Sequence, residues 1–226
     1  MSAESTAFLY PFIEGDERDA ESLLADLATS AQAKWDQSER LRAATLAQCH
    51  DQIATIAAAM ARRFEAGAQL FAFGNGGSAT DADDVAQLFT RPPSGEALPA
   101  RSLVTDHAVL TALSNDIGFD VVFSRQLEAH ARPGDIAMAL STSGNSENLL
   151  VAFTQAARIG MLTVGVSGYD GGRMAASDAL EHCLVVRSDS VHRIQETQAA
   201  LVHALWAAVQ SELATEHHSD RPEGAS

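Results

Sequence analysis

The chain has 226 residues, 46% of them hydrophobic, so it can bury one substantial core and does not require a second. Its 30 acidic and 15 basic residues give a formal net charge of −15, which argues against a broad surface for nucleic acid or anionic membrane. No stretch approaches the roughly 20 apolar residues that span a bilayer, and the N-terminus lacks the basic flank of a signal peptide, so we expect a cytoplasmic protein. Cys49 and Cys183 lie far apart without metal-type spacing, which predicts two reduced thiols.

Residues 1–66 are predicted to form a helical segment that serves oligomerisation. From Leu23 to Phe64, apolar residues recur at helical spacing with polar residues between them, which predicts two or three helices before the first strand. Their apolar stripe exceeds what one face of a sheet can cover, so it favours packing against another subunit. The alternative is that these helices only cap the sheet.

Two strand–turn–helix units follow. The apolar run at 70–73 precedes the turn Gly-Asn-Gly-Gly-Ser at 74–78, and the run at 136–140 precedes Ser-Thr-Ser-Gly-Asn-Ser at 141–146. Glycine lets the backbone approach a ligand closely, and a helix N-terminus offers free N–H groups and about half a positive charge. Ser78 and Ser146 are expected to cap the two helices. Two such turns in one domain predict a phosphorylated ligand.

A dinucleotide is the alternative ligand, because Gly74, Gly76 and Ala79 satisfy the loose pattern G-x-G-x-x-G/A. That pattern expects an acidic residue about 20 residues further on, and Asp106 comes too late to match it. The hydroxyl-rich second turn is also surplus to a dinucleotide site. A sugar phosphate is therefore the preferred ligand.

The rest of the chain continues the alternation of strands and helices. Further strands are expected at 102–104, 162–166 and 183–186, and helices at 108–114, 119–130 and 191–214. Five strands alternating with helices predict a three-layer α/β/α sandwich with a five-stranded parallel sheet and ligands at the carboxyl ends of its strands. Residues 67–214 would form this sugar-phosphate-binding domain, and the polar tail at 215–226 is predicted to be disordered.

Several motifs accompany the two turns: Ser-Asn-Asp at 114–116, Gly-Asp at 134–135, Gly-Tyr-Asp-Gly-Gly at 168–172 and Arg-Ile-Gln-Glu at 193–196. From Leu41 to Ala214, this ordered set resembles the bacterial phosphoheptose isomerases of the sugar isomerase (SIS) superfamily. The resemblance implies a flavodoxin-like fold, usually tetrameric, that acts on sedoheptulose 7-phosphate in the cytoplasm. It also implies a phosphate loop and a set of substrate contacts: Ser141, Thr142, Ser143 and Ser146 for the loop, and Asn75, Ser78, Asp116 and Gln195 for the contacts.

The reaction that the resemblance implies is an aldose–ketose interconversion, in which one group removes a proton beside the carbonyl and another returns a proton to the neighbouring carbon. In the family these groups are a Glu on the helix after the first turn and a His on the last helix. Zinc is bound there by a His one turn before that Glu, by the Glu, and by a Gln and the same His of the last helix. In this chain the last-helix pair is Gln195 and His203.

The other pair differs from the family pattern. Asp84 stands at the position of the metal-binding His, and Leu88 stands at the position of the catalytic Glu. A carboxylate such as Asp84 can still ligate zinc, but Leu88 can neither ligate a metal nor carry a proton. The resemblance therefore implies a zinc site of Asp84, Gln195 and His203, with Asp84 and His203 as the catalytic residues.

Two functions are compatible with these substitutions. In the first, the chain is a sugar-phosphate isomerase in which His203 acts with a substitute carboxylate, Asp84 or Asp116. In the second, it is a non-catalytic sugar-phosphate-binding or regulatory SIS protein, similar to the replication-initiator-associating proteins. Asp84 and His203 also have purely structural interpretations. A histidine on an apolar helix face is often a core residue, and the helix dipole favours an acidic residue such as Asp84 near an N-terminus.

The spacing of the last-helix pair bears on assembly. Gln195 and His203 are eight residues apart, which is roughly 12 Å along a regular helix. Either the last helix begins after Gln195, or different subunits contribute to the site. We predict that the ligand pocket lies at a subunit interface of a homo-oligomer.

Overall fold

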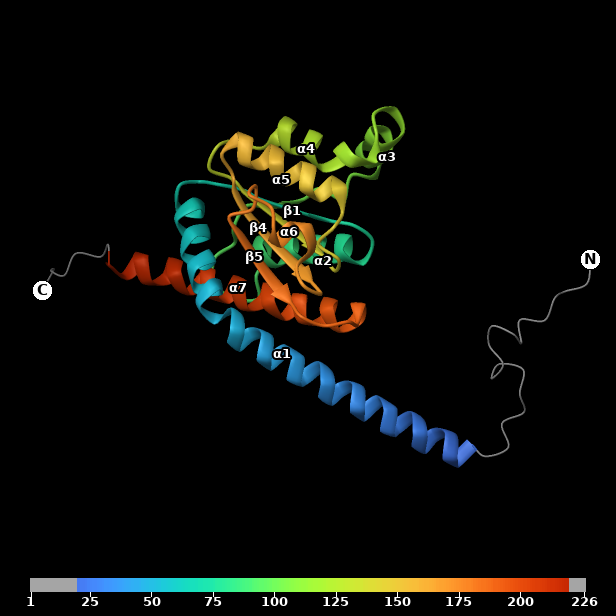
Figure 1. Cartoon of the computed structure of the whole chain (residues 1–226). Coiled ribbons are helices and arrows are strands. Elements are labelled where there is room, and N and C mark those ends of the chain that lie inside the picture. The colour runs from blue at the N-terminus through green and yellow to red at the C-terminus, as the bar shows by residue number, and fades with distance from the viewer. Residues whose placement is uncertain (1–19, 220–226) are drawn as a thin grey trace, which may run out of the picture. The chain divides into compact units, whose positions relative to one another are not determined.

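The computed structural model describes residues 20–219, of which 20–39 and 40–219 belong to two separate compact units (Figure 1). Helix α1 is continuous from Ala20 to Glu65, so the prediction of two or three separate helices is wrong. No glycine or proline interrupts this segment, and its many alanines favour the helical state. Residues 40–65 of the predicted helical segment 1–66 belong to the same compact unit as the sheet.

The sheet has five parallel strands, which confirms the predicted fold class. They are β1 (Leu70–Gly74), β2 (Ala100–Ser102), β3 (Ile136–Ser141), β4 (Leu162–Gly168) and β5 (His182–Val186). Their spatial order is β2-β1-β3-β4-β5, and every neighbouring pair is parallel. The chain order reverses between β1 and β3, and ligands of open α/β sheets bind beside such a point.

Helices cover both faces of the sheet. They are α2 (Gly77–Thr90), α3 (His107–Asp116), the 3-10 turn η2 (Phe119–Val121), α4 (Val122–His130), α5 (Glu147–Ile159), α6 (Gly172–Ala175) and α7 (Val191–Ser219). Figure 1 shows α4 and α5 together on one side of the strands and α7 on the other. The expected three layers are therefore present.

Alternate residues along the strands belong to two separate hydrophobic cores. In β1, Leu70 and Ala72 join a buried cluster with α2, α7 and the second half of α1, whereas Phe71 and Phe73 join a cluster with α4 and α5. Because both faces are covered, β1, β3 and β4 are buried along their whole length, which explains their uninterrupted apolar sequences.

Three local predictions need correction. Strand β2 ends at Ser102 rather than Val104, because the chain turns there and Asp106 then caps α3 by accepting a hydrogen bond from the Val109 amide. The helix expected at 119–130 starts as the 3-10 turn η2. The tail predicted to be disordered from residue 215 continues α7 as far as Ser219, and residues 220–226 lie outside the described part.

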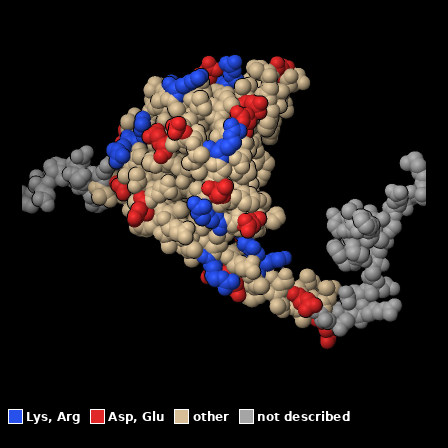
Figure 2. Space-filling model, viewed as in Figure 1, with Lys and Arg blue, Asp and Glu red and all other residues tan. Residues whose placement is uncertain are grey.

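The described surface carries mixed charge. On the face shown in Figure 2, Lys and Arg side chains are interspersed with Asp and Glu rather than gathered in one basic area. Cys49 and Cys183 are both free thiols, as predicted. None of the helices between residues 20 and 219 combines the length and hydropathy that a transmembrane helix needs.

Candidate functional site

The first turn joins β1 to α2 at the carboxyl edge of the sheet. Gly74 ends the strand, and a Cβ there would collide with the backbone of Ser78, so only glycine fits. Gly76 occupies the N-cap position with φ 56°. Ser78 therefore lies inside the first helical turn, where its amide donates to the Asn75 carbonyl at 3.0 Å, and the prediction that Ser78 caps α2 is wrong.

The second turn joins β3 to α5 and brings the predicted phosphate-loop residues together. Ser141 ends β3, and its hydroxyl accepts a hydrogen bond from the Gly144 amide at 3.0 Å. The Ser143 hydroxyl accepts from the Asn145 amide at 3.2 Å. Ser146 occupies the N-cap position of α5, as predicted, but its hydroxyl makes no capping hydrogen bond. The hydroxyls of this turn thus keep their protons available for an anion.

The N-terminus of α5 adds backbone donors to the same place. Within the described residues, the amides of Ser146, Glu147 and Asn148 have no hydrogen-bond acceptor, as expected for the start of a helix. The Glu147 carboxylate is held in an ion pair with Arg173 at 2.6 Å. A helix N-terminus with free amides and adjacent hydroxyls has the chemistry of a phosphate site.

A pair of asparagines connects the two turns. The Asn75 amide nitrogen donates to Asn148 Oδ1 at 2.8 Å, and the Asn148 amide nitrogen donates back to Asn75 Oδ1 at 2.9 Å. Asn148 is the second residue of α5 and is only 3% exposed. Local sequence patterns could not predict this contact, because the partner of Asn148 lies 73 positions away.

Beneath the second turn, a buried glutamine of α7 holds two strand ends. Gln198 Nε2 donates to the carbonyls of Ser141 and Val166 at 3.1 and 3.2 Å. Gln198 has no exposed surface, and its Oε1 has no hydrogen-bond partner. This side chain fixes the start of the hydroxyl-rich turn to β4.

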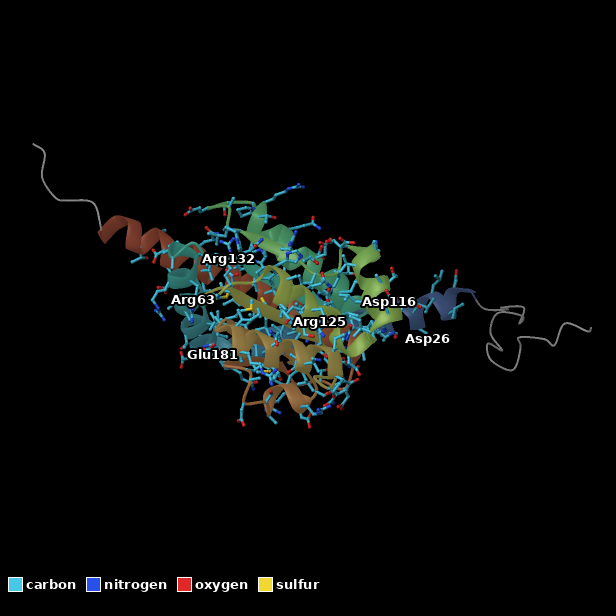
Figure 3. The ribbon with its side chains drawn as sticks, turned by 90° about the horizontal axis from the view of Figure 1, so that it is seen from above. Asp26, Arg63, Asp116, Arg125, Arg132 and Glu181 are labelled. Atoms are coloured by element: carbon cyan, nitrogen blue, oxygen red, sulfur yellow. The ribbon has the colours of Figure 1, made fainter. Side chains whose placement is uncertain are left out.

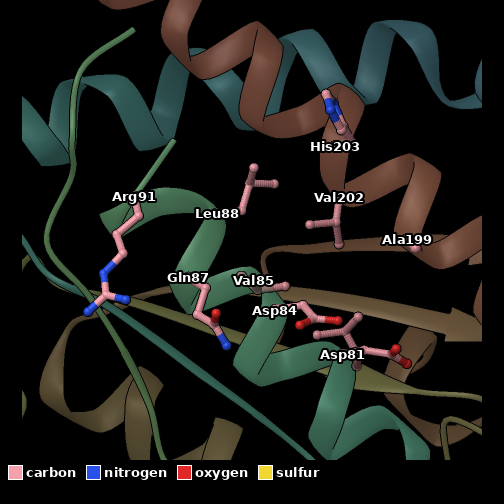
Figure 4. A pocket seen from close by; sticks show the side chains of 10 residues that line it. Asp81, Asp84, Val85, Gln87, Leu88, Arg91, Ala199, Val202 and His203 are labelled. Atoms are coloured by element: carbon pink, nitrogen blue, oxygen red, sulfur yellow. The ribbon is translucent and has the colours of Figure 1, made fainter. Parts of the chain in front are cut away.

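A cavity of about 360 Å³ lies between α2 and α7 (Figure 4). Its lining includes Leu140, which directly precedes Ser141, but none of the residues of the turns 74–78 and 141–146. Asp84 from α2 and His203 from α7 both line it, which brings the two predicted catalytic residues together. The complete lining is Asp81, Asp84, Val85, Gln87, Leu88, Arg91, Leu140, Ala199, Val202 and His203.

Asp81 is a further acidic residue of this cavity that the sequence did not single out. Burial raises the pKa of its carboxyl, the hydrogen bond from Gln195 lowers it, and the negative charge of Asp84 raises it again. Gln195 Nε2 donates to Asp81 Oδ2 at 3.3 Å. The amide of Gln195, predicted to contact substrate and metal, is thus engaged by a carboxylate of α2.

The donors at this cavity do not fit a zinc site of the usual composition. Catalytic zinc takes three His, Cys or carboxylate ligands, and residues 20–219 contain no group of three such side chains placed to hold an ion. Asp84 and His203 line the cavity with Leu88, which has no donor atom. Zinc binding by Asp84, Gln195 and His203 remains a prediction from the resemblance.

The structure removes one of the two explanations for the spacing of Gln195 and His203. Helix α7 begins at Val191, so Gln195 lies inside the helix and the idea that the helix begins after it is wrong. His203 is exposed on this helix and contacts Trp206 edge to face, with ring centroids 5.1 Å apart. It is therefore not a buried core histidine.

Asp116 is not brought to the cavity by the described chain. It is the last residue of α3 (Figure 3), where its carboxylate accepts a hydrogen bond from Asn115 at 2.8 Å. Asp116 is absent from the cavity lining that contains Asp84 and His203. Its predicted contact with substrate remains a prediction.

Residues 35–168 match the family of SIS domains. The chain is 40% identical over 174 residues to the phosphoheptose isomerase of Rhodospirillum rubrum, which covers 74% of this chain and 89% of that protein. It is 49% identical over 157 residues to the phosphoheptose isomerase of Desulfovibrio desulfuricans, covering 66% and 70% of the two chains. The solved structure of phosphoheptose isomerase GmhA from Neisseria gonorrhoeae superposes with a TM-score of 0.76 at 35% identity, over 82% of this chain and 99% of that one.

Proposed function

Because the chain belongs to the phosphoheptose isomerase family of SIS-domain proteins, we propose that it interconverts the ketose and aldose forms of a sugar phosphate, with sedoheptulose 7-phosphate as substrate. The observation that carries this proposal is the position of the cavity between α2 and α7. Its lining includes Leu140, the residue before the turn 141–146, together with Asp84 from α2 and His203 from α7. We propose that the sugar phosphate reaches from the turn 141–146 into this cavity, where its other end meets two proton-transferring side chains.

The phosphate group is expected to bind at the turn 141–146. Ser141, Thr142, Ser143 and Ser146 offer hydroxyl donors, and α5 offers free amides with the positive end of its dipole. The overall net charge of −15 disfavours attraction of an anion at long range. Recognition of the phosphate must therefore depend on these short-range donors.

Isomerisation requires that a proton leave C1 of the ketose and that a proton arrive at C2. Removal of the C1 proton gives an enediolate with its negative charge on O2, and transfer of the O1 proton to O2 moves that charge to O1. Protonation of C2 then leaves the carbonyl at C1. Asp81, Asp84 and His203 are the carboxyl and imidazole groups of the cavity lining, whereas Leu88 cannot exchange protons. The Asp81 carboxylate accepts a hydrogen bond from Gln195, which leaves Asp84 as the freer base. We assign the C1 proton to the Asp84 carboxylate and the return of a proton at C2 to His203.

Further properties rest on the resemblance and on the spacing of Gln195 and His203 along α7. We propose that the protein assembles as a homotetramer in the cytoplasm and that its ligand pocket is completed at a subunit interface. Zinc is proposed only as an ion to be tested for, because the donors of the cavity do not fit it. No proton transfer assigned above requires the ion.

The proposal is tested by incubating the purified protein with sedoheptulose 7-phosphate, with and without added zinc, and following the aldose product by NMR. Wild type should form product, and His203→Ala should lose turnover by at least about a hundredfold, as expected for loss of a group that transfers a proton. Arg125→Ala, which breaks only an exposed ion pair with Glu128, is the control and should keep full activity.

Two results would contradict the assignment. Unchanged turnover in His203→Ala would refute the role of this residue. An inert wild-type protein that the sugar phosphate nevertheless protects against thermal unfolding would show that the chain binds the sugar phosphate without converting it. Asp84→Asn tests the proposed removal of the C1 proton separately from the role of His203, because it keeps the shape of the side chain but removes its basicity.

A further inference from the structure

The reciprocal asparagine pair joins the turn 74–78 to the first turn of α5, which directly follows the turn 141–146. Asn75 follows β1, and Asn148 lies in the first turn of α5, at the point where the strand order reverses. Their two hydrogen bonds, 2.8 and 2.9 Å long, use one donor and one acceptor of each amide. The resemblance assigns Asn75 to the substrate, yet half of its hydrogen-bonding capacity is used by Asn148.

Asn148 is placed to orient Asn75 rather than to contact the ligand. It is 3% exposed and therefore shielded from solvent, while Asn75 is half-buried beside it. An amide pair of this kind is directional, because each side chain must be turned so that its oxygen faces the other's nitrogen. The pair therefore fixes both the rotation of Asn75 and the separation between the turn 74–78 and the N-terminus of α5.

We propose that Asn148 is a positioning residue, which sets the distance between the phosphate-binding turn 141–146 and the sugar-binding turn 74–78 through its amide pair with Asn75. This inference rests on the proposed function, because it assumes that one ligand spans both turns. Inorganic phosphate needs only the first of these turns, whereas a sugar phosphate needs both. Loss of the pair should therefore weaken the binding of a sugar phosphate much more than the binding of inorganic phosphate.

The experiment compares Asn148→Ala, Asn75→Ala and the double variant with wild type. Affinity for inorganic phosphate, measured by calorimetry, should stay within about twofold, as for an independent site. Affinity for sedoheptulose 7-phosphate and kcat should each fall by about tenfold or more, since a shift of about 1 Å between reacting groups has a large effect on rate. The double variant should be no worse than the poorer single variant, because either change already removes the pair.

A matched control removes a buried amide elsewhere. Gln126 is 7% exposed and donates to the carbonyls of Leu103 and Val122 from α4, away from both turns. Gln126→Ala should lower Tm to a similar degree but leave sugar-phosphate affinity and kcat unchanged. If it impairs them as much as Asn148→Ala does, general destabilisation explains the effect and the positioning role is overturned.

The remaining outcomes distinguish this inference from the proposed function. Losses that multiply in the double variant would mean that Asn75 and Asn148 act separately, which overturns the pair. Equal losses for inorganic phosphate and sugar phosphate would mean that the phosphate turn itself has collapsed, which overturns it too. A wild type that binds the sugar phosphate without turnover would refute the isomerase alone, and the binding measurements would still decide the role of Asn148.

Discussion

Leu88 is the residue that most constrains the chemistry of the cavity. It is half-buried on α2, one turn after Asp84, and lines the cavity together with His203. Residues four apart share a helix face, so Leu88→Glu should add a carboxylate beside Asp84 and complete a set of three zinc ligands. We expect zinc affinity, measured by calorimetry, to rise by at least about tenfold over wild type.

Leu88→Gln is the control for that variant, because it has the same length but supplies no carboxylate. It should leave zinc affinity near the wild-type value. Equal affinities in Leu88→Glu and Leu88→Gln would show that Asp84 and His203 are not placed to share an ion with position 88.

The pKa of Asp81 gives a second prediction at this scale. Burial is the largest cause of its raised pKa, so ionisation of this carboxyl disfavours the folded state. The penalty exists above the folded-state pKa and disappears as pH falls below the unfolded value of about 4. Asp81→Asn should therefore raise Tm at pH 7, and the gain should vanish near pH 3.

Asp81→Ala also removes the acceptor for Gln195 and should stabilise the protein less at pH 7 than Asp81→Asn does. Thermal unfolding followed by circular dichroism across this pH range measures both differences. A Tm gain that grows toward acid pH would contradict the assignment of a raised pKa.

At the scale of elements, α7 supports the phosphate turn from below through Gln198. Gln198→Leu would leave the Ser141 and Val166 carbonyls without their donor, at a cost of about 1–3 kcal/mol, partly offset by removal of the unpartnered Oε1. We expect lower stability in urea and weaker binding of inorganic phosphate. Gln210→Leu breaks two hydrogen bonds of the same helix to Glu96, outside the site, and should leave phosphate binding unchanged.

How far the sequence predicted these elements depends on whether their signals are local. The short apolar runs before two Gly/Ser turns correctly located β1, β3 and the turn 141–146. Both the burial of a strand and the conformation of a turn depend mainly on residues that are adjacent in the sequence. The contacts of Asn148 and Gln198 could not be predicted, since their partners lie 73 and 57 positions away. Ser78 was misplaced by two positions, because Gly76 rather than serine occupies the cap.

At the scale of the whole molecule, two observations favour an assembly of several copies. Asp84 and His203 remain exposed although they line a cavity, so the described chain leaves the site open to solvent. Among residues 20–39, Leu24 and Leu27 are 65% and 56% exposed, and leucines exposed to this degree on one helix mark an interaction surface. Since the family resemblance implies a tetramer, we expect light scattering on a sizing column to give the mass of a tetramer.

Replacing those two leucines with charged residues tests the assembly directly. Leu24→Glu combined with Leu27→Glu should shift the mass to smaller species, because burying two carboxylates at an interface costs more than the apolar contact gains. Ala33→Glu, an exposed position nine residues after Leu24 and therefore on the opposite side of the same helix, is the control for added charge alone. Sugar-phosphate affinity should fall in parallel with the mass if the pocket is completed by a neighbouring subunit, whereas a monomer that binds with wild-type affinity would place the complete pocket within one chain.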